Sequence, residues 1–219
     1  MKKILLLFLL FSLNSFAQEF HEGTVNYLNG DTKKGLIKLK GDYLKFKENE
    51  DAKTVKIDDS LLKSIMFESI DGKKYILERV FRQAAFKKFK YCWLQLLQEG
   101  GYYSLYLTAD GYSYSFDQYG NMQLTSSYIN NRTLPCFTYY IKKFDEDKVY
   151  YFSPTSGLNA EYLFRDSCRE FLSDYPELLA RVEKKELKKM NVDYVIDQYN
   201  KFKKKKEIVK TTPIKSKRK

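Results

Sequence analysis

A change in hydrophobic period near Leu158 most constrains the fold of this chain. From Gly23 to about Pro154, apolar and polar residues alternate over short segments, which is the period of half-buried strands. Turn signals such as Asn29-Gly30 separate most of these segments. Beyond Leu158 the apolar residues recur at helical spacing. Closely spaced strands favour antiparallel hairpins over strand–helix–strand units. We therefore expect an α+β protein.

The expected sheet is a bent antiparallel sheet or meander, or an incomplete barrel. Aromatic residues make up 16% of the chain, with 19 Tyr and 16 Phe, and this composition favours strands. Residues 117–135 are expected to form a long loop with some local structure. The expected strands cover residues 23–28, 35–40, 43–47, 54–57, 64–68, 74–80, 91–97, 103–107, 112–116, 137–144 and 149–152.

About three helices are expected after the sheet. Phe164, Cys168 and Phe171 share one apolar stripe, and Pro176 suits the first turn of a second helix. Asn191 is suited to cap the third. Each stripe is too narrow to stabilise an isolated helix. We therefore expect a β-rich domain over residues 18–155, with a helical segment, residues 156–202, packed on it.

The first 17 residues resemble a secretory signal peptide. Lys2 and Lys3 form a basic start, residues 4–13 are almost entirely apolar, and Ser15-Phe16-Ala17 places small residues where a cleavage site requires them. We expect cleavage between Ala17 and Gln18 and a periplasmic or secreted protein. No later segment is apolar for long enough to predict a transmembrane helix after that cleavage.

The net charge of +11 is concentrated at the C-terminus. Residues 201–219 contain ten basic residues and one glutamate, and residues 18–200 are neutral overall. A neutral body argues against a nucleic-acid partner. Residues 203–219 are expected to be a disordered, Lys-rich tail. Its lysines are candidate contacts to an anionic envelope surface or glycan, beginning with Lys203, Lys204, Lys205 and Lys206.

Residues suited to catalysis or metal binding are scarce. His21 is the single histidine, and the three cysteines have no C-x-x-C spacing, so no catalytic residue, metal site or cofactor is predicted. In an oxidising compartment one disulfide is conceivable, with Cys92 and Cys168 as the candidate pair. The favoured interpretation is that both are small buried hydrophobic residues. A carboxylate pair of the glycosidase kind also stays open, because sequence does not show which acids converge.

One strand carries an aromatic row. Tyr112, Tyr114 and Phe116 alternate with Ser113 and Ser115, so one face of this strand is wholly aromatic. If exposed, the row is a candidate ligand face that could stack on sugar rings or contact a partner. The favoured alternative is that these rings line the core or an interface within the sheet.

The order of several segments resembles a known family. The segments are "GTVNYLNGDTKKGLIKL", "FKKFKYCWLQLLQEGGYYSLYL", "CFTYYIKKFDEDKVYYF" and "FRDSCREFLSDYPELLARVEKKELKKMNVDYVIDQYN". They resemble a family of small exported proteins from flavobacteria and their relatives. Its members share a GDT-type first hairpin, here Gly30-Asp31-Thr32, and a helical end finishing in Tyr-Asn, here Tyr199-Asn200. The resemblance spans most of residues 22–200 and implies no activity or site residue.

Together these features predict an exported envelope protein that acts as a non-catalytic binding or structural module. Its expected ligand is a glycan, a lipid or another protein. The alternative is a hydrolase that acts on envelope polymers through a carboxylate pair.

Overall fold

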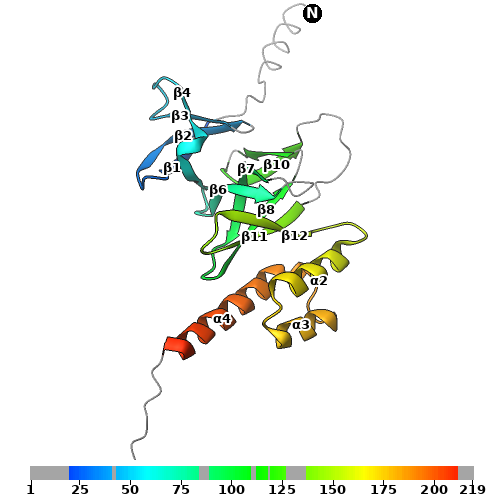
Figure 1. Ribbon diagram of the computed structural model, residues 1–219. Coiled ribbons are helices and arrows are strands. Elements are labelled where there is room, and N and C mark those ends of the chain that lie inside the picture. The colour runs from blue at the N-terminus through cyan, green and yellow to red at the C-terminus, as the bar shows by residue number, and fades with distance from the viewer. Residues whose placement is uncertain are drawn as a thin grey trace, which may run out of the picture.

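The computed structural model describes residues 20–40, 43–83, 89–109, 112–117, 119–126 and 137–211. Ten of the described strands form one sheet in the order β12-β11-β8-β7-β6-β5-β1-β2-β3-β4, and β9 and β10 form a separate hairpin (Figure 1). The strands are β1 (His21–Tyr27), β2 (Thr32–Lys40), β3 (Tyr43–Lys47), β4 (Val55–Ile57), β5 (Leu62–Glu68), β6 (Lys74–Gln83), β7 (Phe89–Gln98), β8 (Tyr103–Ala109), β9 (Tyr112–Phe116), β10 (Met122–Ser126), β11 (Phe137–Lys143) and β12 (Lys148–Pro154).

Part of this sheet closes into a barrel. Strands β6, β7, β8, β11 and β12 pair antiparallel in succession. Strand β12 then returns to β6 as a parallel neighbour, with Lys148 opposite Phe81 and Val149 opposite Arg82. The prediction of an α+β fold with a bent sheet is confirmed. The parallel closure was not predicted, because hydrophobic period does not reveal which distant strands become neighbours.

Side chains fill the barrel interior. Leu94 is fully buried and Tyr106 is almost so. The Tyr106 hydroxyl donates a 2.6 Å hydrogen bond to Oε2 of Glu78, which satisfies a polar group inside the barrel. The interior is therefore a packed core. Its buried members are Val80, Leu94, Tyr106, Tyr140 and Val149.

Helices cover the outer face of β8, β11 and β12 (Figure 1). They are α2 (Ala160–Phe171), α3 (Pro176–Glu183) and α4 (Val192–Thr211), with the 3-10 turn η3 (Lys189–Asn191) before α4. Pro176 begins α3 as expected. Asn191 does not cap α4. Its Oδ1 accepts from the amide of Lys188 and so caps the 3-10 turn. The buried core here is Tyr103, Leu105, Ile141, Phe152, Phe164, Cys168, Leu172, Leu178, Val182, Leu187, Val192, Val195, Ile196 and Tyr199.

Strands β1 to β5 extend the sheet away from the barrel and the helices, to the opposite end of the molecule (Figure 1). The 3-10 turn η1 (Asp59–Leu61) joins β4 to β5. One face of this extension packs against the β9–β10 hairpin. The expected loop over residues 117–135 is therefore wrong at β10, which pairs with β9. The core here is Val25, Ile37, Leu39, Leu44, Phe46, Ile57, Leu62, Ile65, Phe67, Tyr75, Leu77, Trp93 and Tyr114.

The predicted disordered tail is wrong at its beginning, because α4 continues to Thr211. The Phe202 ring stacks on Tyr175 with centroids 4.2 Å apart, and Nζ of Lys203 lies 2.7 Å from Oδ2 of Asp174. These contacts hold the helix on the body, and lysine itself favours helix. The expected signal peptide and residues 212–219 lie outside the described residues.

Candidate functional site

The predicted aromatic ligand face belongs to the core. Tyr114 is 7% exposed, and its hydroxyl lies 3.3 Å from the carbonyl oxygen of Leu107. Phe116 is half-buried, with its ring centroid 4.2 Å from that of Phe67. Burial raises the pKa of Tyr114 to about 12. The exposed-face prediction is therefore wrong at Tyr114, where the core alternative holds, and Phe116 is a partly buried ring packed against the same core. The side chain of Tyr112 lies outside the described residues.

The candidate disulfide between Cys92 and Cys168 is not formed, and the favoured interpretation, a buried hydrophobic residue, holds for Cys168, whereas Cys92 is half-buried. Cys168 is fully buried between the helices and the sheet, whereas Cys92 packs beside the barrel interior. Two cysteines in separate cores cannot be bridged without moving the backbone. Burial raises the pKa of Cys168 to about 12, which makes it an inert core thiol. Cys136 lies outside the described residues.

The four candidate surface lysines divide into two groups. Lys203 is half-buried, binds Asp174 and lies 4.3 Å above the Tyr102 ring, so it holds α4 on the body. Lys206 lies 3.7 Å from the same carboxylate. Lys204 and Lys205 are exposed on the outer side of α4. Contact with an anionic surface needs an exposed lysine. The prediction of such a contact is therefore wrong for Lys203, which is half-buried and paired with Asp174.

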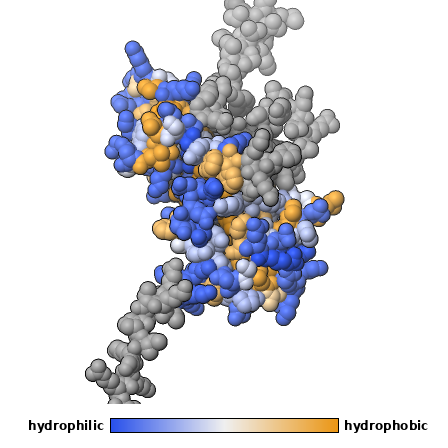
Figure 2. Space-filling model, viewed as in Figure 1, coloured by the Kyte–Doolittle hydropathy of each residue, from blue (hydrophilic) through white to orange (hydrophobic). Residues whose placement is uncertain are grey.

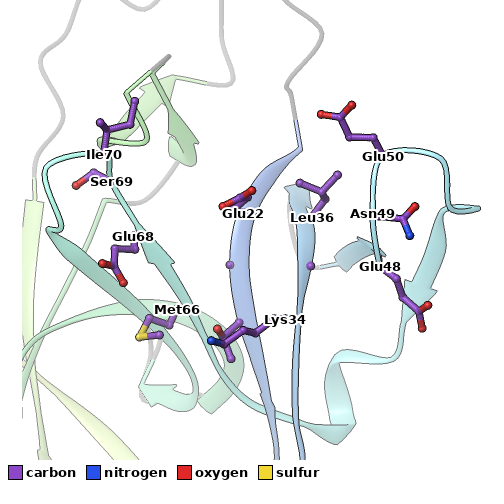
Figure 3. A pocket seen from close by; sticks show the side chains of 13 residues that line it. Glu22, Lys34, Leu36, Glu48, Asn49, Glu50, Met66, Glu68, Ser69 and Ile70 are labelled. Carbon is purple, nitrogen blue, oxygen red and sulfur yellow. The ribbon is translucent and has the colours of Figure 1, made fainter.

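A groove of about 750 Å³ crosses the outer face of β1, β2 and β5, on the side away from the hydrophobic core. The antiparallel register places Glu22 opposite Leu36 on the groove side (Figure 3). Thr24 and Lys34 are also opposite each other and line the groove. Strand β5 adds Met66 and Glu68, and two turns form the rims. The full lining is Glu22, Gly23, Thr24, Lys34, Gly35, Leu36, Glu48, Asn49, Glu50, Met66, Glu68, Ser69 and Ile70.

Two paired glycines lie under this groove and contribute backbone atoms to its lining. Gly23 lies directly opposite Gly35. A Cβ on Gly23 would lie 2.7 Å from the carbonyl oxygen of Met66 and 2.8 Å from Cδ1 of Ile37. A Cβ on Gly35 would lie 2.4 Å from the carbonyl oxygen of Lys47. The added Cβ atoms would also meet the core side chains Ile37, Phe67 and Phe46, so both glycines lack a side chain on the core face of the sheet, where the neighbouring strands leave no room for one.

Hydrogen bonds hold both rims in place. On one side, the amide of Ser69 donates to the carbonyl of Lys73, and the amide of Ile70 donates to the carbonyl of Tyr119 in the β9–β10 turn, both at 2.9 Å. On the other side, Nζ of Lys47 donates to the carbonyl oxygen of Glu50 at 3.3 Å. The groove is therefore largely preformed, which lowers the entropy cost of binding.

The groove combines acidic and apolar groups. Its lining has four glutamates and one lysine. Glu22 and Glu68 come from the strands, and Glu50 reaches over from the opposite loop (Figure 3). Ile70 is 79% exposed at the rim, so an apolar side chain stands beside the carboxylates. The arrangement is suited to a ligand that carries both amino groups and apolar groups.

The two motifs behind the family resemblance have structural roles. In the first hairpin, Gly30 adopts a φ of 93°, and the amide of Asp31 donates to Oδ1 of Asn29. At the helical end, Tyr199 donates a 2.6 Å hydrogen bond to Asp174, and Asn200 binds the backbone of Tyr103. Neither motif contributes to the groove lining.

The sequence did not predict the groove, although its alternating pattern indicates which side chains of β1 and β2 face away from the core. Alternation in β1 and β2 predicts that Glu22 and Leu36 avoid the core face. That they are opposite each other depends on the register, which sequence does not specify. Hydrogen bonds lower the pKa values of five carboxyl groups among the described residues. They are those of Asp58, Asp71, Asp117, Asp174 and Glu183.

The described part of the chain contains no group of three or more His, Cys, Asp or Glu side chains placed to hold a metal ion. His21 lies at the start of β1, with its ring 4.8 Å from that of Phe116. None of the described helices has the length and apolar character needed to cross a bilayer. Comparisons with models of protein families, with curated proteins and with solved structures found no match to this chain.

Proposed function

We propose that this protein is a non-catalytic binding module of the cell envelope, and that its groove binds an extended polypeptide segment with basic and apolar side chains. The observation that carries the proposal is the preformed groove, in which glutamates from strands and loop stand beside the apolar side chains of Leu36, Met66 and Ile70. Export is supported by the basic start, the apolar residues 4–13 and the small residues before Gln18.

The chemistry of the lining supports this ligand class. A basic side chain placed between Glu22 and Glu68 would form charge-assisted hydrogen bonds. Leu36, Met66 and Ile70 provide apolar contacts for intervening side chains. Together these features suit an extended chain better than a compact ligand.

The proposal is tested by calorimetric titration with a ten-residue peptide of alternating Lys and Leu. The wild-type protein should bind it more tightly than a matched peptide of alternating Glu and Leu. Exposed ion pairs contribute about 0.2–1 kcal/mol each, so Glu22→Gln with Glu68→Gln should weaken binding about two- to thirtyfold. Glu177→Gln, an exposed position on α3, is the matched control and should bind as the wild type does.

Equal binding of both peptides, or of the double variant and the wild type, would refute the groove as an acidic peptide site. In an NMR titration with the same peptide, only the amide resonances of groove residues should shift. Shifts confined to α2, α3 and α4 would place the peptide elsewhere and also refute it.

A second candidate is the hydrolase of envelope polymers. The observation in its favour is that carboxylates enter the groove from both the strands and the loop (Figure 3). A glycosidase requires such a pair across its substrate. Incubation with a labelled β-linked cell-wall polysaccharide, followed by analysis of reducing ends, tests this candidate. Turnover that Glu22→Gln or Glu68→Gln abolishes would favour it over the binding module.

A further inference from the structure

Three lysines form a row across the outer face of strands β2, β3 and β4. Lys38 is directly opposite Lys45 in the β2–β3 pair, and Lys45 is directly opposite Lys56 in the β3–β4 pair. The residues that alternate with them along the strands are buried in the core of the sheet extension, so the three lysines lie on the other face. Lys38 and Lys45 are half-buried, and Lys56 is exposed. We call these residues the lysine row.

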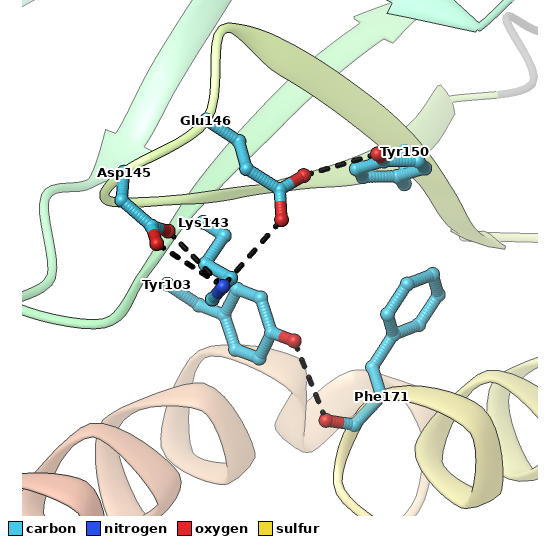
Figure 4. Close-up of polar contacts among 6 residues, drawn as sticks. All are labelled: Tyr103, Lys143, Asp145, Glu146, Tyr150 and Phe171. Carbon is cyan, nitrogen blue, oxygen red and sulfur yellow. Dashed lines mark hydrogen bonds and ion pairs between the residues drawn. The ribbon is translucent and has the colours of Figure 1, made fainter.

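Such a row destabilises the sheet, because like charges directly opposite each other on neighbouring strands repel. Lys45 takes part in both of the pairs. On β11, by contrast, a strand lysine has acidic partners, since Nζ of Lys143 lies 3.2 Å from Asp145 and 3.5 Å from Glu146 (Figure 4). Among the described residues, no ion pair involves Lys38 or Lys45. Ion pairs within the described chain therefore do not offset the repulsion at these two positions.

Protection of a sheet edge does not account for the row. Lysines on an exposed edge strand discourage pairing with other chains. That explanation suits Lys56, because β4 is the last strand of the sheet. Strands β2 and β3 have a neighbour on each side, so Lys38 and Lys45 are not on an edge. Positions that break a local rule in this way are expected at functional sites.

An aromatic ring restrains one end of the row. Nζ of Lys38 lies 5.8 Å and Nζ of Lys47 5.0 Å from the ring centroid of Phe20, the residue before β1. Lys47 is two residues from Lys45 on the same face of β3, so it places a fourth ammonium group beside the row. Contacts of this kind between cations and a ring limit the freedom of both lysines, which lowers the entropy cost of binding.

The acids beside the row belong to other structures. Asp58, two residues after Lys56, caps the turn η1. Glu48 and Glu50 follow β3 and line the groove. No ion pair joins these three acids to the row. The outer face of the extension therefore carries the row on β2, β3 and β4 next to the acids of the groove, and the two are separate sites.

The spacing of the row suits a linear anion. Neighbouring strands lie about 4.8 Å apart, so the positive charges recur at about that interval across the sheet. A polysaccharide with one anionic group on each sugar repeats its charge at a similar interval. Hydrophilic and apolar residues are mixed on the visible surface of this end of the molecule (Figure 2). That surface therefore shows no continuous apolar patch of the kind that marks a protein interface.

We propose that the lysine row binds a linear anionic glycan, whose charged groups pair with Lys38, Lys45 and Lys56 in turn. Binding would also neutralise the repulsion within the row, so that the ligand stabilises the sheet. The choice of a glycan over a nucleic acid rests on the envelope location in the proposed function. The site itself does not depend on the peptide proposal.

The test is a calorimetric titration of the full chain at low salt. The anionic probes are the hexamer of galacturonate and a heparin hexasaccharide, and the neutral probe is the α-1,4-linked hexamer of glucose. The wild type should bind at least one anionic probe and not the neutral one. Lys38→Gln with Lys45→Gln should weaken that binding about two- to thirtyfold, as expected for the loss of two exposed ion pairs. Salt at about 1 M should abolish the binding.

Lys204→Gln with Lys205→Gln is the matched control, because it removes the same charge from exposed positions on α4. It should leave binding close to that of the wild type. Glu22→Gln with Glu68→Gln should not weaken the binding of the anionic glycan, so a failure of the peptide proposal leaves this one intact.

The stability of Lys45→Gln gives a second readout. This change removes both like-charge pairs and should raise the thermal unfolding midpoint at low salt. Salt at about 1 M should remove the gain, because it screens the repulsion in the wild type. The anionic probe should raise the midpoint of the wild type more than that of Lys45→Gln. A lysine with only a structural role would instead lower the midpoint when replaced.

Four results would overturn the proposal. The first is the absence of binding to both anionic glycans, and the second is equal weakening by the two double lysine variants. The third is a lower midpoint for Lys45→Gln at low salt. The fourth is tighter binding of a single-stranded oligonucleotide with the same number of charges, which would assign the row to nucleic acid.

Discussion

The side chain of Asn200 is expected to hold the last helix against the barrel. The loss of stability on replacing it can be calculated from its hydrogen bonds. Oδ1 of Asn200 accepts from the amides of Tyr103 at 2.7 Å and Tyr102 at 3.2 Å, and Nδ2 donates to the carbonyl oxygen of Tyr103 at 2.9 Å. The side chain lies so close to the β7–β8 turn that a Cβ on Gly100 would lie 2.2 Å from Nδ2. A helix residue therefore completes the hydrogen bonding of a turn about a hundred residues earlier in the chain.

The change Asn200→Ala removes all three hydrogen bonds. Each contributes about 1 kcal/mol net, for a total of about 3 kcal/mol. Alanine favours helix over asparagine by roughly 0.5 kcal/mol, which offsets part of the loss. We expect the free energy of unfolding to fall by about 2–3 kcal/mol. Asn200→Asp should lose at least as much at neutral pH, because a carboxylate oxygen would then face the Tyr103 carbonyl.

Urea unfolding followed by circular dichroism measures these differences. Gln198→Ala is the matched control, since it lies two residues earlier on α4 and its side chain contacts its neighbour Asp197. It should change the free energy of unfolding by less than about 0.5 kcal/mol. A loss below about 0.5 kcal/mol for Asn200→Ala would refute the reasoning, and so would equal losses at positions 198 and 200.

Burial raises the pKa of Cys168 to about 12, so native protein near pH 8 should leave this thiol unlabelled by iodoacetamide until denaturant is added. Labelling of Cys168 in the native protein as fast as in the unfolded protein would contradict its burial. The pKa of Asp174 is lowered, because hydrogen bonds from Lys203 and Tyr199 outweigh the raising effect of its partial burial. Its stabilisation should therefore be complete well above 3.8 and should decline as the pH falls through that value, so Asp174→Asn should cost less stability in acid than at neutral pH. Lys204, Lys205 and the basic residues of 207–219 should bring the protein down with anionic vesicles but not with neutral ones. Truncation after Lys206 keeps the Asp174 contacts and should weaken sedimentation with the vesicles. About 1 M salt should abolish the sedimentation. Equal sedimentation of the full and truncated proteins would show that the tail does not bind the vesicles.

Much of the fold could be predicted because its determinants are local. Alternation marks the strands, the positive φ of Gly30 marks the first hairpin, and Pro176 begins α3 as its fixed φ favours. The change of period near Leu158 correctly separates the sheet from the helices. Each of these signals acts within a few residues of the chain, so sequence alone contains it.

The candidate sites could not be predicted, because burial and strand register depend on contacts between residues that are far apart in the sequence. Tyr114 and Tyr91 both lie in alternating aromatic strands, yet the first is 7% exposed and the second 56%. The β9–β10 hairpin packs against the sheet extension and buries Tyr114, whereas Tyr91 on β7 lies at the surface.

The sequence by itself determined the α+β class, the order along the chain of the helices and of the strands other than β10, and most of the turns between them. The tertiary structure decided the barrel closure, the groove over Gly23 and Gly35, and the docking of α4 through Asn200. The physical reason is that period and turn chemistry depend on neighbouring residues. Strand pairing and side-chain burial instead depend on which remote surfaces exclude water together.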